Sequence, residues 1–367
     1  MKIDERGKSD KLILFTALLL SGIGAIMVYS ASAIMSLEKF SDPYFYFKKQ
    51  LLAIIIGTIL MVCAMNFNYK KYYKLAIPSL MFAIVLLILV FIPGINETAK
   101  GATRWIAYKS LRFQPAEFMK FALILYAARY ISKKGDKLSD FTKGILPLSI
   151  VFGIVAVLIM KQPDFGTVMI MAIVLLIMLF IGGMNLKYLF SLMAVITPMA
   201  IFAVLSEPYR MKRITAFLNP WEYPRDSGFQ LIQSLYAFGR GGIFGVGFGE
   251  SREKLFYLPE PHNDFILSVV GEEIGMLGVI TIVGLFFIYV YRGFKVAMNV
   301  DDTFGAMLSA GIVSLIGIQG LINMAVALGL FPTKGITLPF ISYGGSSMIF
   351  MMFLTGVLLN ISENARR

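Results

Sequence analysis

The chain has 367 residues, of which 57% are hydrophobic and only 15% are charged, and its formal net charge is +12. Soluble domains are about 45–50% apolar and about 25% charged, so a water-soluble protein of this composition would expose large apolar patches and aggregate. The composition therefore excludes an ordinary soluble domain and favours a protein that is dissolved in lipid.

Apolar runs long enough to cross a bilayer recur along the whole chain. A membrane-spanning helix needs about 20 mostly apolar residues. The first run is too long for a signal peptide, and its cleavage pattern is weak. The predicted fold is an all-α polytopic membrane protein of about ten transmembrane helices. These spans are predicted at 12–34, 50–66, 75–93, 116–132, 145–160, 166–183, 187–205, 264–291, 304–330 and 341–361.

The connection between the seventh and eighth predicted spans, 206–263, is much longer than the others. It contains Pro208, Pro220 and Pro224, many glycines and an amphipathic stretch at 228–238. It is too polar to cross the membrane and too apolar for a flexible linker, so we expect it to lie on the membrane surface. Its glycine-rich part has no strand–turn–helix context, which argues against a nucleotide site.

Basic residues are distributed unevenly between the two sides of the predicted bundle. With the N-terminus inside, the inner side holds the basic clusters at 2–11, 70–74, 129–143 and 292–295. The positive-inside rule favours this orientation. Both termini, 1–11 and 362–367, are then cytoplasmic and the 206–263 loop is extracytoplasmic. Since topology accounts for the positive charge, we expect no nucleic-acid partner.

Four groups of polar residues lie at the predicted outer ends of apolar segments, and the first two precede the long loop. Glu117 and Lys120 are i,i+3 neighbours near the start of a helix that Pro115 begins. Charges at this depth are costly, so the pair is either a self-neutralising structural pair or part of a site. Asp164 lies in a tight turn and is either a helix cap or a site residue.

The third group closes the long loop. Glu260, His262 and Asp264 precede a helix that carries Glu272 and Glu273. Asp264 is either an N-cap or a functional carboxylate, and His262, the only histidine, is either a surface residue or a site residue. At least one of the two helical glutamates should face a polar interior.

The fourth group is the loop 331–347, which is rich in glycine and hydroxyl side chains and contains Lys334 and Ser342. Its backbone N–H groups can hold an anion such as phosphate, or its small residues can serve to pack helix ends. The orientation was derived from basic residues alone, yet it places all four groups on the outer face. The sequence thus predicts one site there.

Metal chemistry is restricted by the composition. One histidine and one cysteine, Cys63 in an apolar run, cannot build a zinc site, and a lone cysteine excludes a disulfide framework. A divalent ion bound by carboxylates stays open.

Several of these stretches resemble motifs of the SEDS family (shape, elongation, division and sporulation), typified by FtsW, RodA and SpoVE. The resemblance covers nearly the whole chain and is closest to the division and sporulation branch. Asn263 departs from the threonine that the family usually has before its aspartate. The matching stretches are 114–120, 162–167, 209–222, 228–234, 256–264 and 335–347.

The resemblance implies a single SEDS-type transmembrane domain over 1–367 and an enzyme activity. Such proteins are peptidoglycan glycosyltransferases that polymerise lipid II, a disaccharide peptide on undecaprenyl pyrophosphate, at the outer face of the bacterial cytoplasmic membrane. The implied partners are a class B penicillin-binding protein, other division or sporulation proteins and membrane lipid. A lipid II flippase is the alternative, which needs a path to the inner face and usually has repeated halves. No clear internal repeat is visible.

The resemblance also assigns roles to residues. It places the family's essential aspartate at Asp264, which we expect to be the general base or else to hold a divalent cation, Mg²⁺ or Mn²⁺, against pyrophosphate. No other cofactor is implied. The expected substrate contacts are Glu117, Lys120, Arg210, Lys212, Arg213, Glu260, Lys334 and Ser342, and the expected supporting residues are Asp164, His262 and Glu272.

Overall fold

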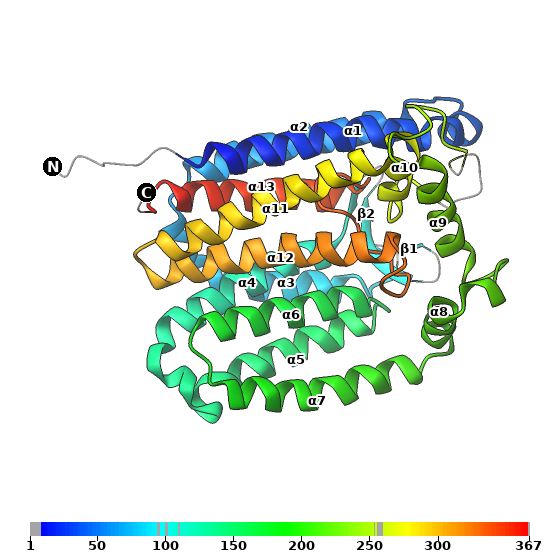
Figure 1. Cartoon of the computed structure of the whole chain (residues 1–367). Helices are drawn as coiled ribbons and strands as arrows, with labels where there is room; N and C mark the ends of the chain where they lie inside the picture. The colour runs from blue at the N-terminus through cyan, green and yellow to red at the C-terminus, as the bar shows by residue number, and fades with distance from the viewer. Residues whose placement is uncertain are drawn as a thin grey trace.

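The computed structural model describes residues 9–93, 96–99, 102–108, 111–252, 254 and 260–365. In these ranges the chain is mostly helical, and long helices lie side by side (Figure 1). Each of the ten predicted spans overlaps one long helix. These helices are α1 Lys11–Phe40, α2 Phe45–Asn66, α3 Tyr72–Leu89, α4 Pro115–Lys134, α5 Leu146–Met160, α6 Phe165–Ile181, α7 Leu186–Leu205, α11 Gly275–Asn299, α12 Thr303–Ala327 and α13 Gly345–Ser362.

Eight helices in the described part of the chain are long and apolar enough to cross a membrane. The two long helices outside this set are α6, which has 17 residues, and α4, which carries Glu117, Lys120 and Arg129 between apolar residues. The chain is thus a multi-pass helical membrane protein, as predicted, while the number of ten spans stays a prediction.

Smaller elements gather at the end of the bundle that lies opposite to both termini (Figure 1). They include an antiparallel sheet in the order β1-β2-β3, which no sequence pattern predicted. The long loop contains two helices, and the predicted amphipathic stretch forms the second of them. The elements at this end are β1 Asn96–Ala99, β2 Ala102–Tyr108, β3 Leu111–Phe113, α8 Pro208–Leu218, Pro220–Glu222, α9 Phe229–Gly241 and α10 Ile266–Glu273.

The bundle has an enclosed centre and an open edge. Of the eight apolar helices, α12 is the most enclosed, and it packs against α4, α6, α11 and α13. In contrast, α7 has no buried residue and exposes large apolar side chains such as Phe190 and Phe202. Apolar side chains on this edge match a lipid environment, whereas polar side chains on α12 are held inside protein.

The helix predicted over 264–291 is wrong in one respect, because it is interrupted at Ile274. Helix α10 ends at Glu273, and α11 begins at Gly275, which has a φ of +75°. A break in a helix leaves carbonyl groups on one side and N–H groups on the other without intrahelical partners. Another segment must therefore satisfy them.

The crossing segment, which we define as 242–247, supplies these partners. Two of its N–H groups, those of Val246 and Gly247, donate to the last carbonyls of α10 at 2.9 and 3.1 Å. Two of its carbonyls, those of Gly242 and Ile243, accept from the first N–H groups of α11 at 2.9 and 3.3 Å. The glycine-rich run after α9 is therefore tied to the α10–α11 break.

Candidate functional site

Glu117 and Lys120 form a buried ion pair in the first turns of α4. Lys120 Nζ donates to Glu117 Oε1 at 2.9 Å and to Gln319 Oε1, on α12, also at 2.9 Å. The glutamate is 8% exposed and the lysine 4%. Removal of one partner would leave a buried charge without compensation, which typically costs about 3–5 kcal/mol.

Gln319 continues this network into the loop between α12 and α13. Its Nε2 donates to the backbone carbonyl of Thr337 at 3.0 Å, and the hydroxyls of Thr337 and Ser347 lie 3.2 Å apart. The first and fourth predicted groups are thus joined through a side chain that sequence reasoning missed. The available signal was an amide within an apolar helix, since polar groups at membrane depth need partners.

Asp264 lies beside the same loop, which we call the site loop, 331–344. The residue that caps α10 is Phe265, so Asp264 is not the N-cap. A Cβ atom added to Gly335 would lie 3.2 Å from Asp264 Oδ2, so the half-buried carboxylate lies against this glycine. The absence of a side chain at Gly335 therefore lets the loop backbone approach the carboxylate.

His262 and Ser342 join the site loop to the residues before Asp264. The Ser342 hydroxyl donates to the carbonyl of Asn263 at 2.7 Å, and the N–H of Tyr343 donates to the carbonyl of His262 at 2.9 Å. The His262 ring is buried, with its centroid 4.3 Å from that of Tyr46 and 5.5 Å from that of Tyr343. The surface interpretation of His262 is therefore wrong.

Three arginines lie near Lys334 of the site loop. We call Arg104, Arg210, Arg213 and Lys334 the cationic cluster. Burial lowers the pKa of Lys334 to about 7; the charge of Asp164 opposes this shift, and the three arginines add to it. Positive charge is therefore concentrated here beyond what one carboxylate neutralises, which favours binding of an anion.

The aromatic ring of Phe165 packs against two side chains of the cationic cluster. Lys334 Nζ lies 4.2 Å from the centroid of its ring, and the guanidinium carbon of Arg210 lies 5.6 Å from it. A Cβ atom added to Gly166 would lie 2.6 Å from Lys334 Cε. In the motif 162–167, Phe165 therefore provides the ring on which Lys334 packs, and Gly166 leaves the space that the lysine side chain occupies.

The other members of the cluster are tied to backbone. Arg213 Nη1 donates to the carbonyl of Thr333 at 3.1 Å, and Arg104 Nε donates to the carbonyl of Gln162 at 3.0 Å. Arg104 comes from β2 and was not among the predicted residues. Its approach joins segments 58 residues apart, for which the sequence contains no local signal.

Asp164 caps α6, as one of its two interpretations predicts. Its carboxylate accepts from the N–H of Thr167 at 3.3 Å and from the hydroxyl of Thr167 at 2.7 Å. The negative charge of the same carboxylate favours the protonated form of Lys334 and so raises its pKa. Lys212 is exposed on α8 and lies roughly 200° around the helix from Arg210. The structure therefore does not bring Lys212 to the side of α8 that holds Arg210 in the cluster.

Glu272 and Glu273, at the end of α10, are both buried, so the prediction of a polar interior is confirmed. Glu273 accepts from Ser30 of α1 at 2.6 Å and lies 2.8 Å from Lys254 Nζ. These contacts hold the end of α10 to α1. Glu272 lies at the end of α10 and Asp264 lies before its start, and Glu272 accepts from the N–H of Arg252, in the long loop.

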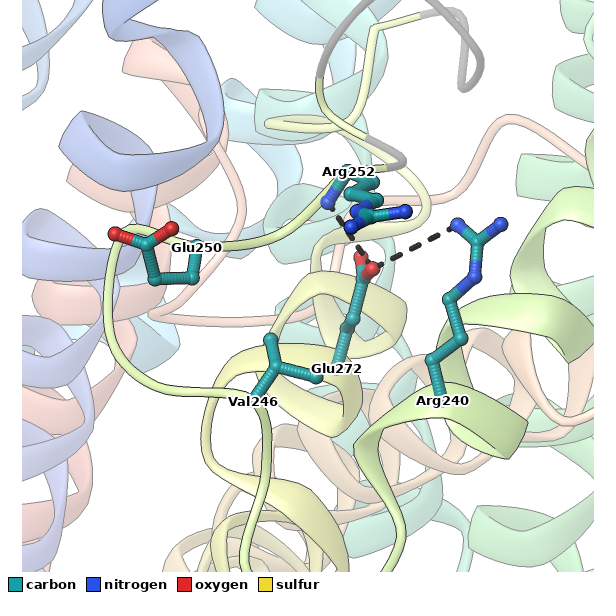
Figure 2. A pocket seen from close by; sticks show the side chains of 5 residues that line it. All are labelled: Arg240, Val246, Glu250, Arg252 and Glu272. Carbon is teal, nitrogen blue, oxygen red and sulfur yellow. Dashed lines mark hydrogen bonds and ion pairs between the residues drawn. The ribbon is translucent and has the colours of Figure 1, made fainter.

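Glu272 lines a pocket of 440 Å³ next to the crossing segment, together with Arg240, Val246, Glu250 and Arg252. Figure 2 shows its carboxylate between Arg240 and Arg252, with Glu250 turned away. The Arg252 N–H donates to Glu272 at 3.0 Å, and Arg240 Nη1 lies 4.0 Å from it.

Glu260 accepts from Asn263 Nδ2 at 3.0 Å. The preceding residues 255–259, which belong to the predicted motif, lie outside the described residues, as do the terminal stretches 1–8 and 366–367.

The donor set at Asp264 limits how a divalent cation could bind. In the part of the chain that the structure describes, no group of three or more His, Cys, Asp or Glu side chains is placed to hold a metal ion. Mg²⁺ is commonly held by one or two carboxylates together with substrate phosphates and water. The residues around Asp264 therefore fit such an ion only together with a phosphate-bearing ligand.

Relatives with known names match the chain over its whole length. It is 46% identical over 366 residues to the "Probable peptidoglycan glycosyltransferase FtsW" of Geobacter sulfurreducens, covering 100% of this chain and 98% of the relative. It is 44% identical over 358 residues to "Stage V sporulation protein E" of Bacillus subtilis, covering 97% and 98%.

Solved structures share the fold. One chain, from work on a peptidoglycan synthase complex that coordinates polymerization and crosslinking, superposes with a TM-score of 0.79 at 27% identity, covering 96% of this chain and 97% of that one. The rod shape determining protein RodA of Thermus thermophilus superposes with a TM-score of 0.73 at 23% identity, covering 98% of both chains. The family described as FTSW_RODA_SPOVE, cell cycle protein, matches residues 10–367. The chain therefore belongs to the FtsW/RodA/SpoVE family.

Proposed function

We propose that this chain is a peptidoglycan glycosyltransferase that polymerises lipid II into glycan strands, in cell division or sporulation. The names of its FtsW and stage V sporulation relatives support the reaction and the process. The observation that carries the proposal is local. Two consecutive residues of the site loop bring two charged groups close together. Lys334 belongs to the cationic cluster, and Gly335 lies against the Asp264 carboxylate.

The two groups suit the two halves of a glycosyl transfer. A new bond forms between the acceptor hydroxyl oxygen, the 4-hydroxyl of N-acetylglucosamine, and the anomeric carbon of the donor. The bond from that carbon to the pyrophosphate breaks, and the pyrophosphate leaves with the electron pair. Asp264 accepts the hydroxyl proton as general base. The cationic cluster stabilises the negative charge that develops on the pyrophosphate.

The acidity of a carboxyl group constrains the timing of proton transfer. A free aspartate has a pKa near 3.9, far below that of a sugar hydroxyl. Asp264 therefore takes the proton late, when the new bond has already made the hydroxyl acidic. A divalent cation held by Asp264 and the pyrophosphate would add further charge neutralisation.

The proposal also includes an orientation in the membrane and a set of partners. We place the protein in the bacterial cytoplasmic membrane with both termini in the cytoplasm and the site loop outside. The separation of the termini from the site end of the bundle supports this arrangement (Figure 1). A class B penicillin-binding protein is the proposed partner, supported by the likeness to a chain of a complex that couples polymerization and crosslinking. Other division or sporulation proteins and membrane lipid complete the set.

The test is reconstitution of the purified chain with lipid II, scored separately for glycan strands and for lipid translocation. Asp264→Asn should lower the polymerisation rate by about 10²–10⁴-fold, the usual contribution of general acid–base catalysis. Asp226→Asn, at an exposed aspartate of the long loop, is the matched control and should keep wild-type activity. Wild-type rates in Asp264→Asn would reject the base assignment. Translocation without glycan strands would favour the flippase alternative.

A further inference from the structure

Two amide side chains of α12 contact the candidate site without a role in the chemistry proposed above. Gln319 and Asn323 are four positions apart and therefore lie on one face of the helix. They are 2% and 1% exposed. Both direct their N–H groups at backbone carbonyls near or within the site loop.

Asn323 joins the backbone of the candidate base to the site loop. Its Nδ2 donates to the carbonyl of Asp264 at 2.8 Å and to the carbonyl of Ile336 at 2.6 Å. Carbonyl oxygens only accept, so the nitrogen of the amide must face them and the orientation of the side chain is determined by its partners. One side chain thus fixes the separation of two segments that are 72 positions apart in the sequence.

Gln319, one helical turn earlier, also joins the site loop to another segment. Its Nε2 donates to the carbonyl of Thr337, and its Oε1 accepts from Lys120. Between α12 and α13 the described chain has no helix or strand, so its carbonyls lack ladder partners. Buried carbonyl groups need donors. The two amides supply them from the most enclosed of the eight apolar helices.

We propose that Gln319 and Asn323 are positioning residues for glycan polymerisation. They hold the site loop in one register, so that the Asp264 carboxylate and the cationic cluster act on the same substrate. This inference rests on the proposed function. A shift of about 1 Å in such a register can lower a rate about 10²-fold, because the reacting atoms must be held close to their reactive geometry.

A matched control comes from the opposite end of the bundle. Asn360 of α13 is also buried, at 2% exposed. Its Nδ2 donates to the carbonyl of Met65 at 2.6 Å, and its Oδ1 accepts from the N–H of Tyr69 at 2.8 Å. It is therefore a buried asparagine that joins two segments, as Asn323 is, but it lies away from the candidate site.

The experiment compares kcat and KM for lipid II in the full-length chain carrying Asn323→Ala, Asn323→Asp or Asn360→Ala. Asn323→Ala removes both donors, and Asn323→Asp keeps the side-chain size while leaving at most one donor, the O–H of a protonated carboxyl group, for the two carbonyls. We expect each to lower kcat roughly tenfold or more, with KM changed less than about threefold. Asn360→Ala should lower the midpoint of thermal unfolding about as much as Asn323→Ala does, but it should keep the wild-type kcat.

A change at Gln319 separates its two contacts. At neutral pH, Gln319→Glu keeps an acceptor for Lys120 but has no donor for the Thr337 carbonyl. We expect kcat to fall as it does in Gln319→Ala. This variant also keeps the proposal testable where an Asn323 variant does not fold.

Three outcomes would overturn the positioning role: wild-type kcat in folded Asn323 variants, an equal loss of kcat in Asn360→Ala, or full activity in Gln319→Glu. Failure of the wild-type chain to polymerise lipid II under conditions in which a known polymerase is active would instead reject the proposed function. The two failures are therefore distinguishable.

Discussion

At the scale of single residues, Lys334 is the side chain at which burial and charge compete most clearly. Burial and three neighbouring arginines favour its neutral form, while Asp164 favours the charged form. With a pKa of about 7, it is only partly protonated near neutral pH in the free protein. A bound anion would favour the charged form and raise this pKa.

The affinity for pyrophosphate should therefore depend on pH. The protonated lysine binds the anion, so the contribution of Lys334 to the affinity is greatest below its pKa of about 7 in the free protein. Above it, this contribution falls by up to about tenfold per pH unit until the pKa of the bound form is reached. Inhibition of polymerisation by inorganic pyrophosphate is measured at constant ionic strength from about pH 6 to about pH 9, and the difference in slope between the wild type and Lys334→Arg reports this contribution, because pyrophosphate titrates equally in both.

Lys334→Arg is the control for this prediction, because a guanidinium group stays charged over the whole range. Its slope should be flatter than that of the wild type. An unchanged slope would assign the pH dependence to another group.

Individual site residues were predictable where a local pattern carried them. Glu117 and Lys120 are recognisable as a pair from their spacing, and Asp164 from its position before a helix. Asn323 and Gln319 were missed because an amide in an apolar helix has the same sequence appearance whether it contacts a loop or a neighbouring helix. Only the path of the site loop gives these amides their partners.

At the scale of elements, the break between α10 and α11 was not predictable from its own sequence. The run over 264–291 is apolar and has no proline, so a continuous helix is the natural prediction. The crossing segment 242–247 imposes the interruption from more than twenty positions away. Gly275 permits it, since a φ of +75° is unfavourable for residues with a side chain.

Gly275→Ala should therefore destabilise the fold. A left-handed conformation costs an alanine about 1–2 kcal/mol, and its Cβ would clash with the backbone N of Gly245. Gly284→Ala, in the same helix, has nothing within 4 Å of the added Cβ and should be neutral or stabilising by about 0.5–1 kcal/mol. Thermal unfolding of both variants in one detergent tests the contrast. Equal midpoints would contradict the role of the break.

At the scale of the whole molecule, the two ends of the bundle differ in what they hold together. The end with the termini joins Asp10 to Arg292, with 2.6 Å between carboxylate oxygen and guanidinium nitrogen, and pairs Val300 with Ala365 in a β-bridge. The opposite end carries the site loop. Hydropathy predicted the helices because lipid imposes one length and one composition on them. It could not predict the sheet or the approach of Arg104 to the other three members of the cationic cluster, which depend on tertiary contacts.

The proposed orientation predicts which end faces the cytoplasm. In a Cys63→Ser background, Glu222→Cys lies at the site end, between α8 and α9, and Asp301→Cys lies between α11 and α12 at the end with the termini. A membrane-impermeant maleimide should label the first in intact cells and the second only after permeabilisation. The reverse pattern would invert the topology and exclude the proposed outer-face reaction.

The aromatic enclosure of His262 has a practical consequence. It is the only imidazole in 367 residues, and it lies two positions before Asp264, against Tyr46 and Tyr343. Isotope labelling restricted to histidine would therefore give a single set of ring resonances from the whole protein in a detergent micelle or nanodisc. Those resonances would sense lipid II or pyrophosphate arriving at the neighbouring carboxylate, without any introduced probe.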